Sequence, residues 1–225
     1  MLQRRHLSLT YLELAPAKPE NAPLIIMLHG YGSNEKDLMQ LAPSLRPEFR
    51  YISVRAPQEM DFGMFAWFPL EFTPTGIRVD HGEAQRAAEQ LIGFIKEIIA
   101  EYQPLGNKVF LMGFSQGTVM SYLMAFLAPE LQHGVIACSG QLPDKTMPHE
   151  TLKPALRKLP FLVMHGSFDE VLPIAKGLAA KAWLEEHVED LTWRQYPMAH
   201  QISDDGVELI CSWLEKRVPH AAEKE

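Results

Sequence analysis

The sequence predicts a single α/β domain in which a mostly parallel sheet carries helices on both faces. Short continuous apolar runs recur along the chain, most clearly at 23–28, 109–112 and 160–164, and such runs are typical of strands buried on both sides. Amphipathic segments of helical period separate them, which is the alternating order of a parallel sheet. The length of 225 residues suits one domain of this class. We therefore expect one domain over 1–218 and a polar tail over 219–225.

The expected elements follow one another in regular order. Leu7, Leu9 and Tyr11 alternate with polar residues, which predicts an amphipathic strand near a sheet edge. Asn34 is placed to cap a helix over about 35–45. The other predicted elements are strands at 23–28 and 49–54, a helix at 82–102, a strand at 109–112 followed by a helix at 118–127, strands at 134–138 and 160–164, a helix at 174–187, a strand at 191–196, and a last helix capped by Ser203.

Composition restricts the classes of partner. The net charge of −7 argues against nucleic acid, since phosphate is neutralised by clustered Lys and Arg. No run approaches the ~20 apolar residues of a membrane span, and the basic start is not followed by the apolar region of a signal peptide. Cys138 and Cys211 lie far apart in apolar surroundings, as buried thiols of a reducing compartment do. We expect a cytoplasmic protein that is not integral to a membrane.

The stretch 108–117 carries the strongest functional signal. An apolar strand leads directly into Gly113-Phe-Ser-Gln-Gly117, and a helix-compatible segment follows. A G-x-S-x-G sequence between a strand and a helix is the pattern of a nucleophile elbow, a tight turn that exposes the serine hydroxyl above the sheet. The two glycines lack the Cβ atoms that would keep strand and helix apart. Ser115 is therefore the predicted nucleophile.

Two downstream residues are placed to activate this serine. A serine hydroxyl needs a base to take its proton, and the base needs a carboxylate to orient it. In open α/β sheets, such groups gather beyond the carboxyl ends of the strands. Asp169 follows the predicted strand 160–164, and His200 follows the predicted strand 191–196. The chain order Ser115, Asp169, His200 is the one that G-x-S-x-G enzymes with an α/β sheet use.

Alternatives to these roles remain open at the sequence level. Asp169 could be only a turn or helix-cap residue, and the neighbouring Glu170 could replace it as the acid. His200 could be a histidine of a surface loop.

The other histidines compete less well for the role of base. His81 borders the aromatic-rich segment and could line the pocket. His29 and His165 lie in His-Gly turns and are expected to brace those loops by hydrogen bonding. No spacing among the nine histidines matches a metal motif, so no metal is predicted.

A further requirement is a cradle for the oxyanion of acyl transfer. Two backbone N–H donors are needed, one directly after the nucleophile and one from the loop after an earlier strand. Gln116 supplies the first. Tyr31 is placed for the second, because Gly30 and Gly32 on either side give that backbone the freedom to turn its N–H inward.

The irregular segment 58–80 is the predicted acyl-binding wall. A loop of this length in a compact domain usually has a function. Its methionines and aromatics either pack into the core or line a groove, and we expect some to do each. Apolar surface rich in methionine suits pliable acyl chains. The expected substrate-binding residues are Met64, Phe65, Trp67, Phe68, Leu70 and Leu172.

Together these motifs resemble the phospholipase/carboxylesterase family of α/β-hydrolases, which includes bacterial carboxylesterases and acyl-protein thioesterases. The resemblance covers about 23–214. It departs at Thr118, where the family often has a further glycine. It implies that Ser115, Asp169 and His200 form the catalytic triad, that Tyr31 and Gln116 form the oxyanion hole, that Trp67 and Phe68 face the active site, and that no cofactor is needed. The motifs that carry it are Leu28-His-Gly-Tyr-Gly32, Arg55-Ala-Pro57, Trp67-Phe68, Gly113-Phe-Ser-Gln-Gly117, His165-Gly-Ser-Phe-Asp169 with Val171 and Pro173, and His200 before the last helix.

The expected function is therefore a serine esterase that cleaves short- to medium-chain acyl esters through an acyl-enzyme. An acyl-protein thioesterase, or a lysophospholipase, would use the same residues, and the sequence does not separate these activities. A non-catalytic protein of this fold that binds an apolar ligand is a further alternative, which a complete triad disfavours. The expected partner is a small-molecule acyl ester or thioester, with the protein a monomer or a homodimer.

Overall fold

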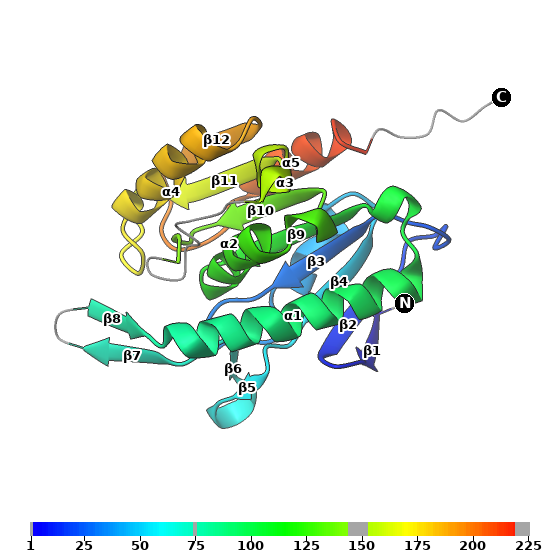
Figure 1. Cartoon of the computed structure of the whole chain (residues 1–225), viewed down its shortest axis with the longest axis horizontal. Helices are drawn as coiled ribbons and strands as arrows, with labels where there is room; N and C mark the ends of the chain where they lie inside the picture. Colours follow the sequence, from blue (N-terminus) through cyan, green and yellow to red (C-terminus); the bar gives the residue numbers. More distant parts are fainter. Residues whose placement is uncertain (1, 74–75, 144–152, 219–225) are drawn as a thin grey trace.

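The central element is an eight-stranded sheet with the order β1-β2-β4-β3-β9-β10-β11-β12. This computed structural model describes residues 2–73, 76–143 and 153–218, so the predicted tail lies outside the described residues. The first two strands run antiparallel to their neighbours, and the strands from β4 to β12 pair in parallel (Figure 1). The strands are β1 (Leu2–His6), β2 (Thr10–Leu14), β3 (Leu24–Leu28), β4 (Arg50–Val54), β9 (Val109–Phe114), β10 (Gly134–Cys138), β11 (Phe161–Gly166) and β12 (Leu191–Tyr196).

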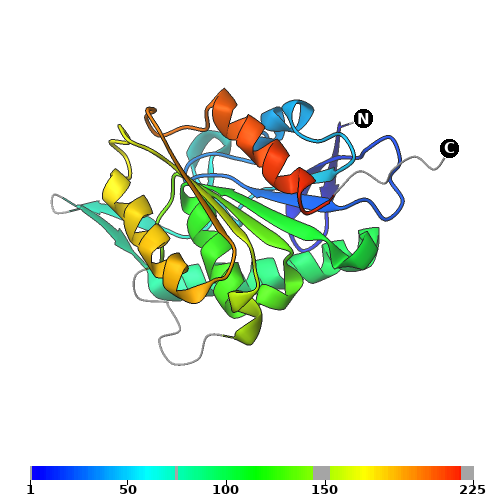
Figure 2. The same ribbon diagram turned by 90° about the horizontal axis from the view of Figure 1, so that it is seen from above.

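Helices cover both faces of this sheet, as the sequence predicts (Figure 2). On one face, α1 (His81–Tyr102), α2 (Gln116–Leu127) and α4 (Ile174–His187) pack over the strands. On the other face lie the 3₁₀ helix η1 (Leu38–Ser44) and α5 (Asp204–Glu215). The remaining elements are short: η2 (Asp61–Gly63), η3 (Leu105–Asn107), η4 (Pro129–Leu131), α3 (Pro154–Arg157), and the strand pairs β5 (Gln58–Glu59) with β6 (Phe65–Ala66) and β7 (Leu70–Thr73) with β8 (Gly76–Val79).

Strand β3 is apolar throughout, and both of its faces are covered. All five residues of β3 are fully buried. Leu24, Ile26 and Leu28 enter the core under α1 and α2, whereas Ile25 and Met27 enter the core under η1 and α5. This two-sided burial explains why the strand is a continuous apolar run in the sequence. None of the helices in the described residues is long and apolar enough to cross a membrane.

The chain before β3 differs from the prediction. The alternation of Leu7, Leu9 and Tyr11 predicts one strand, but the chain reverses at 7–9 and forms a hairpin of β1 and β2. Leu9 and Tyr11 still enter the core, as their pattern requires. An alternating pattern reports which side chains are buried, and it does not fix where the backbone turns.

The helix predicted after β3 is also different. Asn34 does not cap an α-helix over 35–45; its side-chain oxygen accepts the N–H of Lys36 at 3.0 Å, which is the local turn that Asn favours. A 3₁₀ helix follows at Leu38–Ser44 and contains Pro43. Proline lacks the N–H that a regular α-helix needs at that position.

The segment 58–80 is more ordered than predicted. It forms two short antiparallel pairs, β5 with β6 and β7 with β8. Phe65 also bridges to Ser33, with its N–H donating to the Ser33 carbonyl at 2.7 Å. This bridge holds the segment against the loop that follows β3.

Candidate active site

Ser115 lies at the tight turn between β9 and α2, as the elbow pattern predicts. Its backbone has φ 54° and ψ −115°, a conformation that non-glycine residues adopt only under constraint. A Cβ on Gly113 would lie 2.3 Å from the Gly117 carbonyl oxygen, and one on Gly117 would lie 1.8 Å from the Leu28 carbonyl oxygen. Both glycines are therefore required for strand and helix to pass this closely. The serine itself is half-buried, so its side chain remains reachable.

The loop after β3 runs directly beside the serine. A Cβ on Gly30 would lie 3.3 Å from the Ser115 Cβ. Gly32 has φ 73° and donates its N–H to the Phe65 carbonyl at 3.0 Å. Tyr31 lies between these two glycines. Gln116 is the first residue of α2, and a helix has no internal acceptors for the N–H groups of its first turn. The two predicted oxyanion donors thus belong to the segments that adjoin Ser115.

His29 braces this loop, as its His-Gly turn predicts. The Ala56 N–H donates to His29 Nε2 at 3.1 Å, which leaves the proton on Nδ1 to donate to the Gly30 carbonyl at 2.8 Å. Burial lowers the pKa of His29 below its usual value, so the ring is neutral at neutral pH. Trp67 Nε1–H donates to the His29 carbonyl at 2.9 Å, which connects the loop to the aromatic segment.

The Gln116 side chain joins the elbow to this aromatic segment. Its amide oxygen accepts the Trp67 N–H at 2.9 Å, and its amide nitrogen donates to the Phe68 carbonyl at 2.7 Å. All three residues are buried. The side-chain amide therefore pairs with the backbone of 67–68 as a neighbouring strand would. The sequence does not predict this connection.

The expectation that Trp67 and Phe68 face the active site requires correction. Both side chains are fully buried in the core under α1 and α2, and Phe65 is buried there too. The backbones of Trp67 and Phe68 bind the Gln116 side chain, and the Trp67 ring donates to the His29 carbonyl, so both rings are held inside the protein. Met64 is 37% exposed, whereas Leu70 and Leu172 are partly buried. These three residues retain surface that a substrate can reach.

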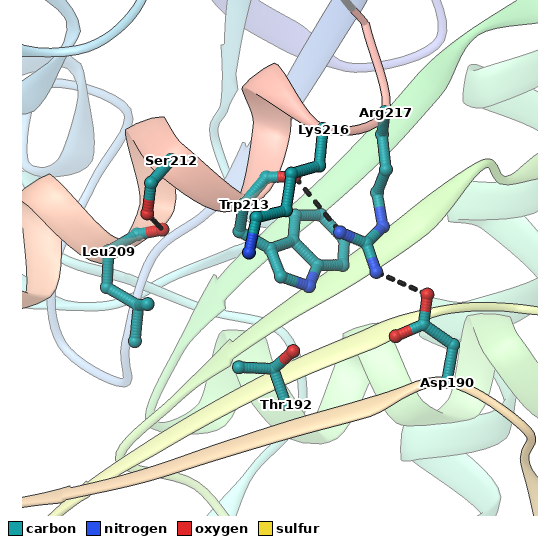
Figure 3. Close-up of a pocket in the computed structure, with 7 residues that line it drawn as sticks. All are labelled: Asp190, Thr192, Leu209, Ser212, Trp213, Lys216 and Arg217. Carbon is teal, nitrogen blue, oxygen red and sulfur yellow. Dashed lines mark hydrogen bonds and ion pairs between the residues drawn. The ribbon is translucent and has the colours of Figure 1, made fainter.

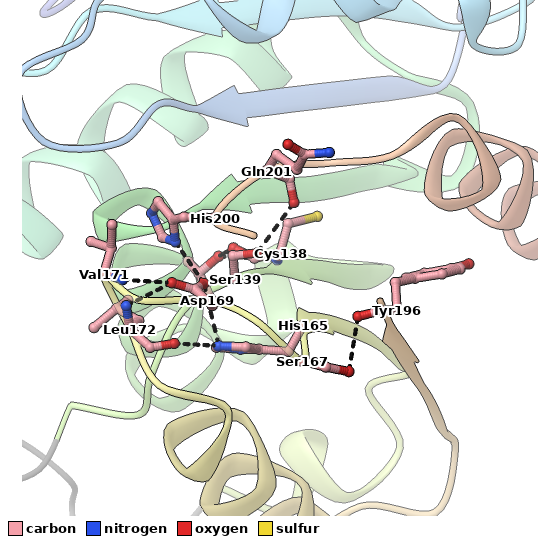
Figure 4. A network of polar contacts seen from close by, with 11 residues as sticks. Cys138, Ser139, His165, Ser167, Asp169, Val171, Leu172, Tyr196, His200 and Gln201 are labelled. Carbon is pink, nitrogen blue, oxygen red and sulfur yellow. Dashed lines mark hydrogen bonds and ion pairs between the residues drawn. The ribbon is translucent and has the colours of Figure 1, made fainter. Parts of the chain in front are cut away.

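Asp169 and His200 are in direct contact. His200 Nδ1 lies 2.7 Å from Asp169 Oδ2 (Figure 4). A carboxylate only accepts, so Nδ1 carries the proton and Nε2 is left as the basic nitrogen. The other carboxylate oxygen accepts the N–H groups of Val171 at 3.0 Å and Leu172 at 2.8 Å. Asp169 is buried, while Glu170, the alternative acid, is exposed.

His165 braces the loop that carries Asp169. Its ring is fully buried. Its Nε2–H donates to the Leu172 carbonyl at 2.7 Å and lies 3.5 Å from Asp169 Oδ2. Leu172 is thereby held at its carbonyl, while its N–H binds the Asp169 carboxylate. This confirms the role expected for the histidine of the second His-Gly turn.

His200 reaches the elbow through a ring contact. Its ring centroid lies 4.8 Å from that of Phe114, the residue before Ser115. Among the described residues, this ring pair joins His200 to the elbow, rather than a hydrogen bond to the Ser115 hydroxyl. Catalytic hydrogen bonds are often long in an unliganded site and shorten when substrate binds. Ser115, Asp169 and His200 each follow the carboxyl end of a parallel strand, β9, β11 or β12, and so lie at the same edge of the sheet.

Comparison with known proteins identifies the family. The model of the Phospholipase/Carboxylesterase family matches residues 9–218. The chain belongs to the phospholipase/carboxylesterase family.

Individual proteins and solved structures are similar over almost the whole chain. A probable carboxylesterase of Oryza sativa subsp. japonica is 27% identical over 224 residues, covering 94% of this chain and 84% of that protein. Acyl-protein thioesterase 1 of Yarrowia lipolytica is 25% identical, covering 90% and 95%. The crystal structure of a carboxylesterase from Mesorhizobium loti superimposes with a TM-score of 0.82 at 21% identity, covering 95% of this chain and 98% of that one. The central sheet and its helices are therefore an α/β-hydrolase fold.

A separate hollow lies away from Ser115, Asp169 and His200. It has a volume of about 330 Å³ and lies between the start of β12 and the end of α5 (Figure 3). Asp190 and Arg217 at its rim form an ion pair at 2.5 Å. The hollow is at the amino end of β12, whereas His200 follows the carboxyl end, so it belongs to the opposite edge of the sheet. Its lining residues are Asp190, Thr192, Leu209, Ser212, Trp213, Lys216 and Arg217.

Ser139 is a residue of the site region that sequence reasoning misses. It directly follows β10, is fully buried and has φ 47°. Its position just beyond the carboxyl end of a central strand is a signal that could have drawn attention to it. Nothing in the sequence indicates its left-handed backbone conformation, because serine rarely adopts that conformation.

Proposed function

We propose that this protein is a serine carboxylesterase that cleaves short- to medium-chain acyl esters through an acyl-enzyme intermediate. Membership of the phospholipase/carboxylesterase family makes it an ester or thioester hydrolase. The observation that carries the specific proposal is the 2.7 Å contact between His200 Nδ1 and Asp169 Oδ2, at the sheet edge where Ser115 lies in a strained turn.

In the proposed mechanism, the Ser115 hydroxyl attacks the carbonyl carbon of the ester. His200 Nε2 takes the hydroxyl proton, and Asp169 stabilises the imidazolium that forms. The tetrahedral intermediate collapses, the proton passes from His200 to the leaving alkoxide, and the alcohol departs. Water then attacks the acyl-enzyme by the same steps, giving its proton to His200, and the acid is released while Ser115 recovers its proton.

The proposed oxyanion donors are the backbone N–H groups of Tyr31 and Gln116. Each would stabilise the negative charge of the tetrahedral intermediate, and the loss of one such donor typically costs about 2.7–4 kcal/mol. The glycines around Tyr31, the braced His29 and the first turn of α2 support this arrangement. Since both donors belong to the main chain, side-chain substitutions at these positions leave the N–H groups in the protein.

Apolar side chains beside Asp169 and beside the Tyr31 loop support an acyl substrate. Phe168 is 67% exposed and Val171 is 57% exposed, on either side of Asp169. Beside the Tyr31 loop, Met64 is partly exposed, and its sulfur would lie 4.0 Å from a Cβ on Gly32. Exposed apolar groups of this kind favour an acyl chain over a charged ligand. We propose that Met64, Leu70 and Leu172 contact the chain directly, and that Phe65, Trp67 and Phe68 support them.

Hydrolysis of acyl thioesters is the second candidate. The acyl-protein thioesterase of Yarrowia lipolytica is similar over 90% of this chain, and the groups proposed above would serve a thiolate leaving group equally well. A lysophospholipase activity would use them too. For the location we propose the cytoplasm, because Cys138 and Cys211 are free thiols.

Matched oxygen esters and thioesters, with acyl groups from acetyl to dodecanoyl, test the proposal. We expect kcat/KM to be highest for oxygen esters of short to medium length and to fall for the longest chains. Ser115→Ala is the control for background hydrolysis. Thioesters that outperform the matched esters at every chain length would favour the second candidate, and turnover that survives in Ser115→Ala would reject both.

A further inference from the structure

Strand β10 lies between the strand that leads to Ser115 and the strand that leads to Asp169, yet it contributes no residue to the proposed triad. The strand order in this part of the sheet is β9-β10-β11. The residue that follows it, Ser139, is fully buried and has φ 47°. Buried non-glycine residues held in this left-handed region cluster at functional sites. The end of β10 therefore has a conformation that needs an explanation.

Ser139 and its neighbour Cys138 contact all three segments of the site, and Figure 4 shows the contact to Gln201. The Ser115 N–H donates to the Cys138 carbonyl at 3.0 Å, and the Ser139 N–H donates to the Met164 carbonyl of β11 at 2.8 Å. The Ser139 hydroxyl donates to the carbonyl of Gln201, the residue after His200, at 3.3 Å. Two consecutive residues thus link the elbow, the strand of the acid and the loop of the base.

This junction has little freedom to move. The Thr118 hydroxyl of α2 lies 2.8 Å from both the Gly113 and the Cys138 carbonyl oxygens, between which its one proton is shared, and it accepts the Cys138 N–H at 3.1 Å. On its other side, a Cβ on Gly140 would lie 2.3 Å from the Thr118 Cβ. The backbone around Ser139 is therefore fixed by the helix that begins beside Ser115.

The residue type at this position is informative. Glycine adopts a positive φ without steric conflict and is the usual residue there. A serine in the same conformation is strained, and its hydroxyl is the group that glycine lacks. In this protein that hydroxyl makes its contact with the loop of His200. Strand β10 pairs with β9 and β11 but not with β12, which leads to the His200 loop. The strained Ser139 makes its side-chain hydrogen bond to that loop.

We infer that Ser139 is a positioning residue that holds the His200 loop in register with Ser115. It touches neither substrate nor a reacting atom; its hydroxyl fixes the Gln201 carbonyl, and with it the placement of the imidazole. The inference rests on the proposed roles of Ser115 and His200. Its effect is expected in the chemical step, because a small displacement of a catalytic base lowers the rate far more than it lowers substrate binding.

Two substitutions separate this role from a structural one. Ser139→Ala removes the hydroxyl and keeps the strained backbone, whereas Ser139→Gly removes both the hydroxyl and the strain. We expect Ser139→Gly to have a higher Tm than Ser139→Ala. For both variants we expect kcat to fall by about tenfold with KM within about twofold of the wild type. Hydrogen exchange of 198–203 should become faster in both. Ser212→Ala is the matched control, since it removes a hydroxyl-to-carbonyl bond of 3.0 Å on α5.

The results distinguish the inference from the proposed function. A Ser139→Gly variant with wild-type kcat and wild-type exchange of 198–203 would overturn the inference, whatever its Tm. A loss of kcat in Ser139→Gly that Ser212→Ala does not share would support it. Turnover that survives in Ser115→Ala would reject the proposed function, and it is measured separately from the Ser139 variants.

Discussion

At the scale of single residues, the geometry of Ser115 depends on the absence of side chains at Gly113 and Gly117. The serine has φ 54°, and the glycines two positions before and after it let β9, α2 and the end of β3 approach one another. The elbow pattern in the sequence predicts this turn because the pattern itself encodes the steric requirement. The positive φ of Ser139 could not be predicted in this way, since no glycine or other sequence pattern at this position indicates it.

The glycine after the serine offers a direct test of this requirement. Gly117→Ala places a Cβ 1.8 Å from the Leu28 carbonyl oxygen, which is main chain and cannot rotate away. We expect a loss of about 1–3 kcal/mol in the free energy of unfolding, together with a large fall in kcat as α2 shifts from the elbow. Denaturant unfolding and ester hydrolysis measure the two effects.

Gly93 of α1 provides the matched control. A Cβ there meets no atom within 4 Å, and alanine in a helix interior is more stable than glycine by roughly 0.5–1 kcal/mol. Gly93→Ala should therefore raise the stability and leave kcat unchanged. Equal stability of Gly117→Ala and the wild type would contradict this account of the elbow.

At the scale of elements, the loop after β3 is held by ion pairs with arginines from other parts of the chain. The loop after β3 contains Glu35, whose side chain is fully buried. It accepts Arg55 Nε at 2.8 Å and Arg55 Nη2 at 2.6 Å, and Arg4 Nη2 at 2.8 Å. Burial alone would raise the pKa of Glu35, but the hydrogen bonds and charges of Arg55 and Arg4 lower it below its usual 4.5.

This lowered pKa predicts how stability depends on pH. The folded state binds the proton of Glu35 less readily than the unfolded state does, so the stabilisation is complete above about pH 4.5 and is lost as the pH falls through the folded pKa. We expect Glu35→Gln to lower the free energy of unfolding at pH 7 by about 1–3 kcal/mol. The difference from the wild type should shrink below pH 4.5, which thermal unfolding at several pH values measures.

Glu130 is the control for an exposed pair. It lies 3.1 Å from Lys153, with both side chains about half exposed, and pairs of this kind contribute about 0–1 kcal/mol. Glu130→Gln should therefore have a smaller effect at pH 7. A difference between Glu35→Gln and the wild type that stays constant or grows toward acid pH would be incompatible with the ion-pair account.

At the scale of the whole molecule, the fold class was the most predictable feature. Buried parallel strands are local apolar runs, and the sheet brings their carboxyl ends to one edge, so Asp169 and His200 could be expected near each other. Positions set by long-range contacts could not be predicted. Trp67 and Phe68 are buried because the Gln116 amide, far away in the sequence, binds their backbone. Thr118, noted only as a departure from the family, joins β9 to β10.

The single-domain boundary and the active form of the protein remain predictions at this scale. Residues 9–218 match the family, and the hollow between β12 and α5 lies at the opposite edge of the sheet from the proposed site. All proposed catalytic groups come from one chain, so we expect a monomer to be active. Activity per chain that does not change on dilution would agree with this expectation.

The most direct measurement of the central claim is the rate and location of labelling by a fluorophosphonate probe. The account predicts an adduct on Ser115, found by mass spectrometry of the digested protein, and none in Ser115→Ala. It also predicts that labelling slows by about 10²–10⁴-fold in His200→Ala, because the base that activates the serine is gone. An adduct on another residue, or a wild-type rate of Ser115 labelling in His200→Ala, would contradict it.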